Sequence, residues 1–506
     1  MNNQEFNDFI YENLQEIPPE DIVADVNPTK QAMDRIVAGI ALSTITLNFL
    51  CLNYILPAIG IIALLLGFRA LKNENHWFHK GYIAVMIKSV CIFTTFILNS
   101  MILGQEIQTE LYTRISIGLN LIATIILLYC LWQGIKAVQA KANMEVKAES
   151  AGALIVWYLL ICICGVIKIN GMVIVGGLLI IYFFILRSLS QLSKELDEAG
   201  YLIHAVDVRF SDITIIKGIV ILLAAGLLSG YVFFRSYSMD WNKKNDIVSA
   251  EVMEIKERLI TLGFPEKILD DLSEEEILTY KDASQIVVDI NEYPFNDGRE
   301  VVEKYLDETW IATVYDVNEL KVTDIAVELN NDKNWIFLHH FLWQEEPEYL
   351  SFSGFSGTES IQIWPVYYNQ ETGWRKAGEA SGQLLYDKDG ITYTSEYHYL
   401  GEKTYTSNDV FFGTKTSNDL FAAFSLPKEG ESKRGYILYQ TEGLEEGWIA
   451  SSWFNYTHQM HPFQYPVKTA MQTRMESSWN DAGAFKTVQD AFQFYVSEEG
   501  VEMAGE

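Results

Sequence analysis

The first 235 residues of the chain consist largely of apolar runs separated by short polar segments. A helix needs about 20 apolar residues to cross the hydrocarbon core of a membrane. Three runs have about this length, at residues 82–103, 115–132 and 213–234. Each of them predicts one membrane-spanning helix.

Two other apolar runs are too long for a single span. As one helix, residues 36–68 would be about 50 Å long, against a hydrocarbon core of about 30 Å. Asn53 and Pro57 interrupt this run, which favours a tight hairpin of two short spans, with one tilted span as the alternative. Residues 153–186 are broken in the same way at 168–171. The pattern therefore predicts about seven spans between residues 36 and 235.

The charge of the loops predicts the orientation of these spans. Connections around Arg69, Lys136 and Arg187 are basic, whereas the alternate connections are acidic or very short. Basic loops of membrane proteins lie mainly in the cytoplasm. With seven spans, this rule places an acidic tail, residues 1–35, in the cytoplasm and everything after Arg235 outside the cell. If residues 36–68 formed one span, only the tail would change sides.

Few polar residues interrupt the predicted spans, and the lipid bilayer is their expected partner. Lys88 and Lys217 lie near enough to a helix end for their amines to reach the membrane surface. Gly226 and Gly230 form a GxxxG pattern, which permits close helix packing. Packing within the bundle is the favoured interpretation, and an oligomer formed through these two glycines is the alternative.

After residue 235 the long apolar runs end. Between residues 246 and 262 apolar residues recur at helical spacing, and Gly263 and Pro265 stop this pattern. Ser273 and Glu276 have the spacing of a helix capping box. These signals predict a helical stalk over residues 236–288, with a helical cap as the alternative.

Beyond residue 289 short β-branched and aromatic segments, separated by turn residues, predict strands. They cover residues 310–329, 335–343, 361–368, 383–386, 391–399, 420–425, 435–440 and 448–454. Residues 387–390 predict a hairpin turn, and residues 485–496 an amphipathic helix. The predicted fold is an all-α membrane bundle, then the stalk, then a mainly antiparallel β-sandwich of jelly-roll type over residues 289–506.

The net charge of −29 comes almost entirely from the part of the chain after residue 237, which holds 48 of the 66 acidic but only 21 of the 37 basic residues. Such a surface repels phosphate backbones, so we expect no nucleic-acid partner. It favours solubility, with binding of a cation or a cationic ligand as the alternative. All five cysteines lie in the apolar runs, and a domain without disulfides fits a bacterial exterior.

The motifs predict no catalytic, cofactor-binding or metal-binding residue. The segment from Gly354 to Thr358 lacks the last glycine of a nucleophile elbow and is interpreted as a loop. His458 and His461 could supply two metal ligands, but a zinc site needs three or four, so we expect surface or packing histidines. Asn455 begins a glycosylation pattern that a bacterium without that machinery does not use.

Aromatic residues are the one enrichment in the region after residue 235. It holds nine of the 12 tryptophans and many tyrosines. Exposed rings beside Asp, Asn and Gln would suit stacking on sugar rings, whereas buried rings build a core. Core packing is the favoured interpretation, and glycan recognition is the alternative.

Two short stretches resemble uncharacterised multi-spanning membrane proteins of Gram-positive bacteria (Firmicutes). The stretch from Pro57 to Lys72, followed by a basic loop and another apolar run, is similar to their small helical-hairpin modules, although His76 and Trp77 occupy a loop that is usually glycine-rich. The segment from Leu262 to Glu276 resembles a second part of such proteins. The resemblance implies a Gram-positive plasma membrane and no activity.

These observations support three hypotheses about function. The leading one is a non-enzymatic plasma-membrane protein whose exterior domain senses or binds a cell-wall glycan or a protein partner. The second is a structural or accessory subunit of a membrane complex. The third is an extracytoplasmic hydrolase, whose catalytic carboxylates the sequence does not identify.

Overall fold

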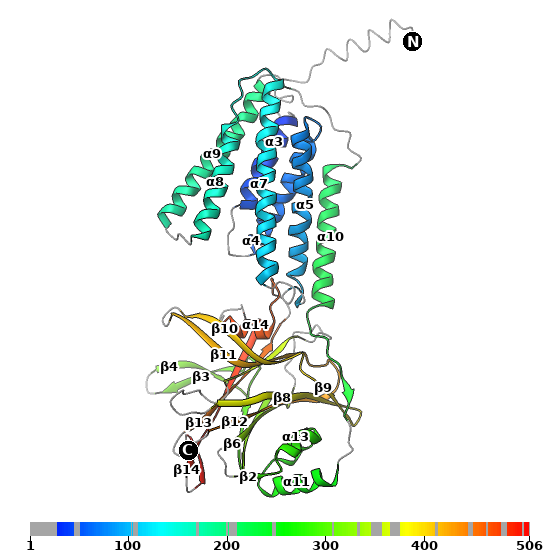
Figure 1. Cartoon of the computed structure of the whole chain (residues 1–506), viewed down its shortest axis with the longest axis vertical. Helices are drawn as coiled ribbons and strands as arrows, with labels where there is room; N and C mark the ends of the chain where they lie inside the picture. Colours follow the sequence, from blue (N-terminus) through cyan, green and yellow to red (C-terminus); the bar gives the residue numbers. More distant parts are fainter. Residues whose placement is uncertain are drawn as a thin grey trace. The chain divides into compact units, whose positions relative to one another are not determined.

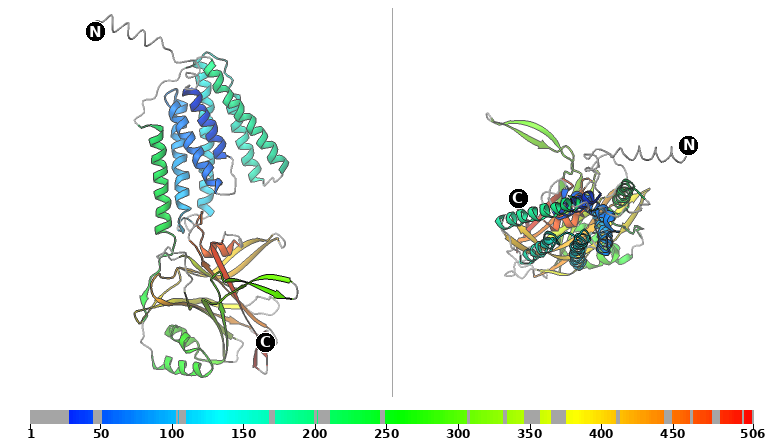
Figure 2. Two further views of the ribbon diagram at one scale, coloured as in Figure 1. Left: turned by 180° about the vertical axis from the view of Figure 1, so that it is seen from behind. Right: turned by 90° about the horizontal axis from the view of Figure 1, so that it is seen from above.

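In a computed structural model the chain forms two compact units, Met1–Gly230 and Tyr231–Glu506 (Figures 1 and 2). The described residues are 28–44, 51–102, 104, 110–167, 172–198, 201, 210–244, 249–305, 308–330, 334–345, 357–364, 375–409, 413–443, 449–461, 464–476, 483–497 and 500–504. Most of the predicted acidic tail, and the predicted break at residues 168–171, lie outside them.

The first unit is helical. Its helices are α3 (Pro28–Thr44), α4 (Leu52–Leu71), α5 (His76–Leu98), α7 (Glu110–Lys141), α8 (Glu149–Val166), α9 (Met172–Glu198) and α10 (Asp212–Phe233). Within the described residues, six helices are long and apolar enough to cross a membrane, and α3 is not among them. The prediction of seven spans is therefore one too many.

Within the described residues, helix α3 is too short and too polar at its start to span a membrane. It has 17 residues, and Lys30, Asp34 and Arg35 lie in its first half. The apolar part from Ile36 onward rises about 14 Å, roughly half of a hydrocarbon core. Residues 36–68 nevertheless form two helices, as the hairpin prediction required, with α3 packed against α4.

Gly226 and Gly230 of α10 face the C-terminal end of α5 and the residues directly after it. A Cβ atom on Gly226 would come 2.5 Å from the side chain of Ile97, and one on Gly230 would collide with Ser100. The small faces of both glycines are therefore used for packing within this chain, which is the favoured of the two predicted roles.

The prediction for Lys88 needs correction. Its side chain is buried, and its amine donates a hydrogen bond to the hydroxyl of Thr124 on α7 at 2.5 Å. Lys88 therefore points into the bundle, because α5 and α7 pack together at its level. Lys217 on α10 is exposed.

The second unit contains two large antiparallel sheets and a ribbon of β3 (Arg299–Tyr305) and β4 (Glu308–Val314). The seven-stranded sheet has the order β1 (Asn242–Lys243), β9 (Ile391–Ser395), β8 (Arg375–Lys388), β12 (Glu431–Glu442), β6 (Asn334–Trp343), β5 (Leu320–Leu329), β2 (Ala283–Tyr293). The six-stranded sheet has the order β10 (Tyr399–Asp409), β11 (Gly413–Phe424), β7 (Glu359–Trp364), β13 (Ile449–Gln459), β14 (Phe485–Ser497), β15 (Gly500–Met503). The prediction of a mainly antiparallel β-rich domain is confirmed.

The two large sheets share one hydrophobic core. Phe337 of β6 packs in it with Phe454 of β13 and Phe492 of β14. Trp335 and Trp343 are also buried there, so these tryptophans serve packing, as the favoured interpretation predicted.

Three short helices cover the other face of the seven-stranded sheet. They are α11 (Ala250–Thr261), α12 (Glu266–Leu269) and α13 (Glu274–Thr279), and Figure 1 labels α11 and α13 beside β2 and β6. Val252 and Leu259 of α11 belong to the same buried hydrophobic cluster as Ile325 of β5. The predicted capping box of Ser273 and Glu276 is present at the start of α13. The predicted stalk over residues 236–288 is corrected, because these apolar helix faces bury themselves on the sheet and β2 already begins at Ala283.

Two local predictions in the second unit have opposite outcomes. The hairpin turn at residues 387–390 is confirmed, with Asp389 at φ 52° and Gly390 at φ 74° between β8 and β9. The helix predicted over residues 485–496 is wrong, because this segment forms strand β14. Phe492, Phe494 and Val496 alternate at the period of a strand and face the shared core.

Candidate functional site: a polar cleft on the seven-stranded sheet

The outer face of the seven-stranded sheet is the face that carries the three short helices. It is apolar along one part of its strands and polar along the adjoining part. The apolar part includes Ile325 of β5 and Ile336 of β6, and the three short helices cover it. Further along the same face lie Thr323 of β5 and His340 of β6, which are paired across the two strands. This polar part is the floor of a cleft.

The cleft has a volume of about 1180 Å³. Residues 265–274, in and next to α12, form one wall, and residues of β2, β5, β6, β8, β9 and β12 form the floor. Pockets that hold small molecules typically have volumes of about 300–1,000 Å³. The cleft is therefore large enough for a small-molecule ligand, and most of the residues that line it carry charged, hydroxyl or amide groups.

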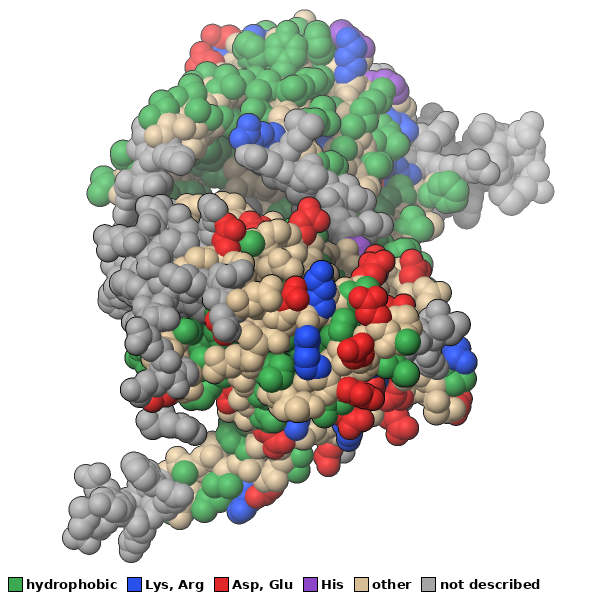
Figure 3. Space-filling model, turned by 60° about the horizontal axis from the view of Figure 1, so that its bottom comes forward, with side chains coloured by type: hydrophobic (Ala, Val, Ile, Leu, Met, Phe, Trp, Pro, Cys, Tyr) green, Lys and Arg blue, Asp and Glu red, His purple; other side chains and the backbone are tan. Residues whose placement is uncertain are grey.

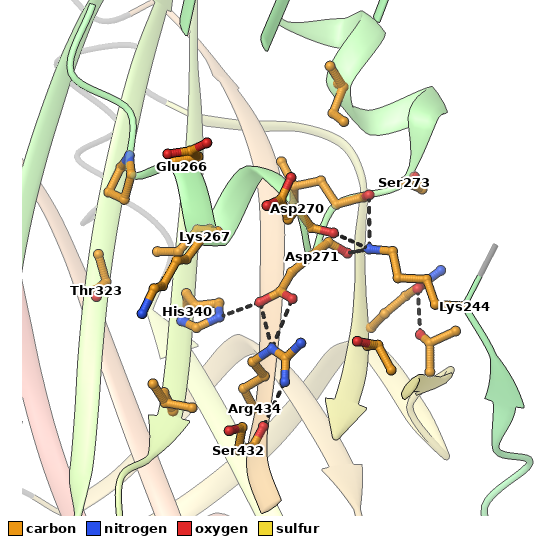
Figure 4. A pocket seen from close by; sticks show the side chains of 18 of the residues that line it. Lys244, Glu266, Lys267, Asp270, Asp271, Ser273, Thr323, His340, Ser432 and Arg434 are labelled. Carbon is orange, nitrogen blue, oxygen red and sulfur yellow. Dashed lines mark hydrogen bonds and ion pairs between the residues drawn. The ribbon is translucent and has the colours of Figure 1, made fainter. Parts of the chain in front are cut away.

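Asp271 lies in the cleft between a histidine and an arginine (Figure 4). Its carboxylate accepts a hydrogen bond from Nε of Arg434 at 2.9 Å and lies 3.1 Å from Nε2 of His340. The guanidinium of Arg434 also donates to Asp387 on β8 at 2.9 Å. One arginine on β12 thus joins the wall of the cleft to its floor.

The charges of this group are fixed by their surroundings. Burial alone would raise the pKa of Asp271, but the hydrogen bond and charge of His340, and then the charge of Arg434, hold that pKa below its ordinary value. Burial would lower the pKa of Arg434, but the carboxylates of Asp271 and Asp387 outweigh it and raise that pKa. Asp271 and Arg434 therefore remain an ion pair at neutral pH.

Two lysines are tied to the wall of the cleft. The amine of Lys244 donates to the backbone carbonyl oxygens of Asp270, at 2.6 Å, of Asp271, and of Leu272, at 3.2 Å (Figure 4). The amine of Lys256 forms an ion pair with the carboxylate of Asp270 at 2.9 Å. These contacts hold the residues between α12 and α13 above the sheet.

Lys267 and Lys321 also line the cleft, but their amines form no such hydrogen bonds or ion pairs with its wall. Figure 4 shows the amine of Lys267, on α12, pointing into the cleft toward the strands that carry Thr323 and His340. Lys321 lies on β5, on the same face as Thr323. Among the described residues, neither amine has an ion-pair or hydrogen-bond partner.

A second polar group lies inside the core, on the opposite face of the same two strands. Nδ1 of His339 is 2.6 Å from Oδ1 of Asp324, and its Nε2 is 2.8 Å from the hydroxyl of Ser452 on β13. These are the connections of a Ser–His–Asp triad. All three residues are 0% exposed, so no substrate reaches Ser452. The group joins the two sheets through buried hydrogen bonds.

The described residues whose motifs suggested catalysis, metal binding or glycosylation do not line the cleft. His458 is buried, with Nδ1 2.7 Å from Oε1 of Glu359, as expected for a packing histidine. The described residues contain no group of three or more His, Cys, Asp or Glu side chains that could hold a metal. Asn455 is fully buried and accepts a hydrogen bond from Arg474, so the glycosylation pattern lies inside the sheet. Thr358 is buried, and Gly354–Ser356 lie outside the described residues.

The motif analysis missed Asp271, Arg434, Lys267 and Lys321. The local signal at this wall was a pair of charged residues, Asp270 and Asp271, between the apolar residues Leu269 and Leu272. Such a pattern marks a buried charge that needs a partner, but it does not say which distant segment supplies that partner. The cleft combines segments separated by more than 150 positions in the sequence, since Arg434 and Asp271 are 163 residues apart.

Comparison with known proteins adds no assignment. No protein-family model and no curated protein match the chain. Among solved structures, the chain is similar to one described as a pore forming protein, with 6% identity and a TM-score of 0.19 over 41% of this chain and 100% of that one. Another is AvmM, described as catalysing macrocyclization in alchivemycin A biosynthesis, with 10% identity and a TM-score of 0.16 over 38% and 94%. Likenesses at these TM-scores carry no argument about this chain.

Proposed function

We propose that this chain is a multi-pass plasma-membrane protein of a Gram-positive bacterium whose second unit lies outside the cell and binds a component of the cell envelope. Six apolar helices support the location in a membrane. The observation that carries the binding function is the polar cleft of about 1180 Å³, whose wall is fixed to its floor by Asp271 and Arg434. A preorganised concave site of this kind is what a small polar ligand requires.

The proposed orientation rests on the charges at one end of the first unit. Arg35 of α3 and Arg69 of α4 both bind the carboxylate of Asp212, at 2.7 Å and 2.9 Å. These contacts bring the N-terminal half of α3, the basic end of α4 and the start of α10 together. The positive-inside rule assigns this end to the cytoplasm. Because α10 begins there and ends at Phe233, the residues after it follow on the outer side.

We infer that the two large sheets form a β-sandwich of jelly-roll type. Their shared core supports this architecture, since it is filled from β6 and β12 of one sheet and from β13 and β14 of the other. A sandwich leaves the outer face of each sheet available, and the cleft lies on one of these faces.

The cleft supports binding better than hydrolysis. A general acid at neutral pH needs a pKa raised toward the working pH. The pKa of Asp271 is held low instead, and its carboxylate is engaged by Arg434 and His340. The most buried carboxylate of the cleft therefore organises the site and is poorly suited to proton transfer.

A subunit of a membrane complex is the second candidate function. Helix α10 buries only Gly230 among its residues, and Leu222 and Phe233 on it are both 73% exposed. This apolar surface is available to lipid or to a helix of another protein. Stable co-purification with one partner in mild detergent would favour this candidate.

The test of the proposed function is retention of the full-length protein, in detergent, on isolated cell walls with and without calcium. Ile290 lines the cleft and is 50% exposed, so I290W should obstruct the site without entering the core and should abolish retention. The matched control is V302W on the β3–β4 ribbon, at a residue that is 68% exposed, which should be retained like the natural protein. Equal retention of both variants, or no retention of the natural protein, would contradict binding in the cleft.

A further inference from the structure

The carboxylates of the cleft are largely engaged, whereas two of its lysines are not. Asp271 and Asp387 bind Arg434, and Asp270 binds Lys256. The carboxylate of Glu274 accepts a hydrogen bond from the backbone of Ser249. Among the described residues, Lys267 and Lys321 are therefore the cations of the cleft whose amines have no direct ion-pair or hydrogen-bond partner, within a domain that is strongly acidic overall.

Neighbouring acidic groups do not cancel this charge by direct contact. Glu292 is paired with Lys321 across β2 and β5, but its carboxylate accepts a hydrogen bond from Gln344. Glu266, next to Lys267, is exposed at the edge of the cleft. On the face seen in Figure 3, acidic side chains gather on the surface of the second unit. An anion would therefore be repelled from most of this surface and held best between the two lysines.

The rest of the floor offers hydrogen-bonding groups suited to hydroxyl-rich molecules. Thr394 donates to Oε1 of Gln383 at 2.7 Å, which leaves the amide nitrogen of Gln383 as a donor for a ligand. Thr392 donates to Asp387 at 2.8 Å, and its oxygen remains an acceptor. Such a set of fixed donors and acceptors beside two amines matches a molecule with several hydroxyl groups and one negative charge.

We infer that the cleft binds an anionic saccharide, with its carboxylate or phosphate held between Lys267 and Lys321 and its hydroxyl groups on the floor formed by β8 and β9. This inference rests on the proposed function and names the chemical class of the ligand. The volume of about 1180 Å³ exceeds that of a typical small-molecule pocket and accommodates more than one sugar ring.

The experiment is calorimetric titration of the full-length protein in detergent with three probes: glucose 6-phosphate, glucuronic acid and glucose. Binding of either charged sugar, with no measurable binding of glucose, is the expected result, and the preferred charged sugar identifies phosphate or carboxylate as the anionic group. K267Q/K321Q should weaken that binding by at least about tenfold, because each charge-assisted hydrogen bond contributes strongly to affinity. K281Q/K388Q removes two positive charges outside the cleft and should leave the affinity unchanged.

Two kinds of result would overturn the inference. One is glucose binding as tightly as the charged sugars, or no charged sugar binding at millimolar concentration. The other is an affinity that K267Q/K321Q leaves unchanged, or that the control variant reduces equally.

Retention on cell walls distinguishes failure of the anionic ligand from failure of the proposed envelope binding. If retention depends on Ile290 but not on the lysines, envelope binding stands and the anionic ligand fails, whereas loss of all retention removes both.

Discussion

Asp490 of β14 is a buried carboxyl group next to the Asp324–His339–Ser452 group. Its side chain is 3% exposed, and Oδ1 accepts a hydrogen bond from Asn291 of β2 at 3.1 Å. Burial first, and then the negative charges of Asp324 and Asp289, raise the pKa of Asp490 to about 7, although Tyr293 and His339 act in the opposite direction. The folded protein therefore keeps a proton here that the unfolded chain releases in weakly acidic solution.

Replacing Asp490 with Asn should flatten the pH dependence of stability. An acid whose pKa is higher in the folded than in the unfolded state stabilises the fold less as pH rises from the unfolded value to the folded value. The free energy of unfolding should fall by about 2 kcal/mol between about pH 5 and pH 7 in the natural protein, and most of this fall should be absent in D490N. Urea denaturation followed by tryptophan fluorescence measures it.

The control for this prediction is D316N. Asp316 is ion-paired with Arg299 on the surface, and this contact lowers its pKa, so the carboxyl is ionised throughout that pH range. D316N should therefore keep the natural slope of stability against pH. The same slope in D490N would show that Asp490 does not hold the proton.

Among the elements, α3 and α4 depend on small residues for their close approach. A Cβ atom on Gly39 of α3 would lie 2.7 Å from the carbonyl oxygen of Gly60 on α4 and 2.7 Å from Leu64. The Leu64 atom belongs to a side chain, whereas the carbonyl oxygen of Gly60 belongs to the backbone of α4. The two helices would therefore have to separate. The close approach therefore packs α3 directly against α4.

G39A should therefore destabilise the first unit, although alanine is the better helix former. Overpacking typically costs about 1–3 kcal/mol, which exceeds the gain of about 1 kcal/mol in helix propensity. A lowered thermal unfolding midpoint in detergent is the expected result. G218A on α10 is the control, because a Cβ atom there meets nothing within 4 Å, and its midpoint should not fall. A midpoint for G39A at or above the natural value would contradict the packing argument.

The elements also show what local pattern can and cannot predict. Apolar runs located the spanning helices, and the Asp389–Gly390 turn was recognisable because it needs positive φ. Segment 485–496 was predicted as a helix but forms a strand. Its apolar residues alternate along the strand, but the same segment also fits a helical pattern of apolar and polar positions. The cleft was not predictable, since Lys267, Lys321 and Arg434 come from α12, β5 and β12 and meet only through the order of strands in the sheet.

At the scale of the molecule, each unit has its own hydrophobic core. The core of the first unit contains residues of α3, α4, α5, α7, α8 and α9, including Phe68 and Trp157. The second unit has one core between its sheets and another beneath α11 to α13. A compact unit with a complete core can fold by itself.

We therefore expect residues 236–506, expressed alone, to form a folded, soluble domain. Circular dichroism should show β structure, and thermal unfolding should be a single cooperative transition. A chain that begins at residue 284 lacks the three short helices and exposes Ile325, Ile336 and Leu385, so it should aggregate. Failure of residues 236–506 to unfold cooperatively would contradict the assignment of an independent core.

The placement of His339 in the core and His340 in the cleft has a consequence for how this protein can evolve. Neighbouring residues of a strand point to opposite faces, so inserting or deleting one residue within β6 would exchange the two histidines. The exchange would disrupt two features at once: the buried hydrogen bonds that join the two sheets, and the floor of the cleft. Homologous chains should therefore keep β6 at constant length, even where its composition drifts, and should gain or lose residues only in the connections before Asn334 and after Trp343.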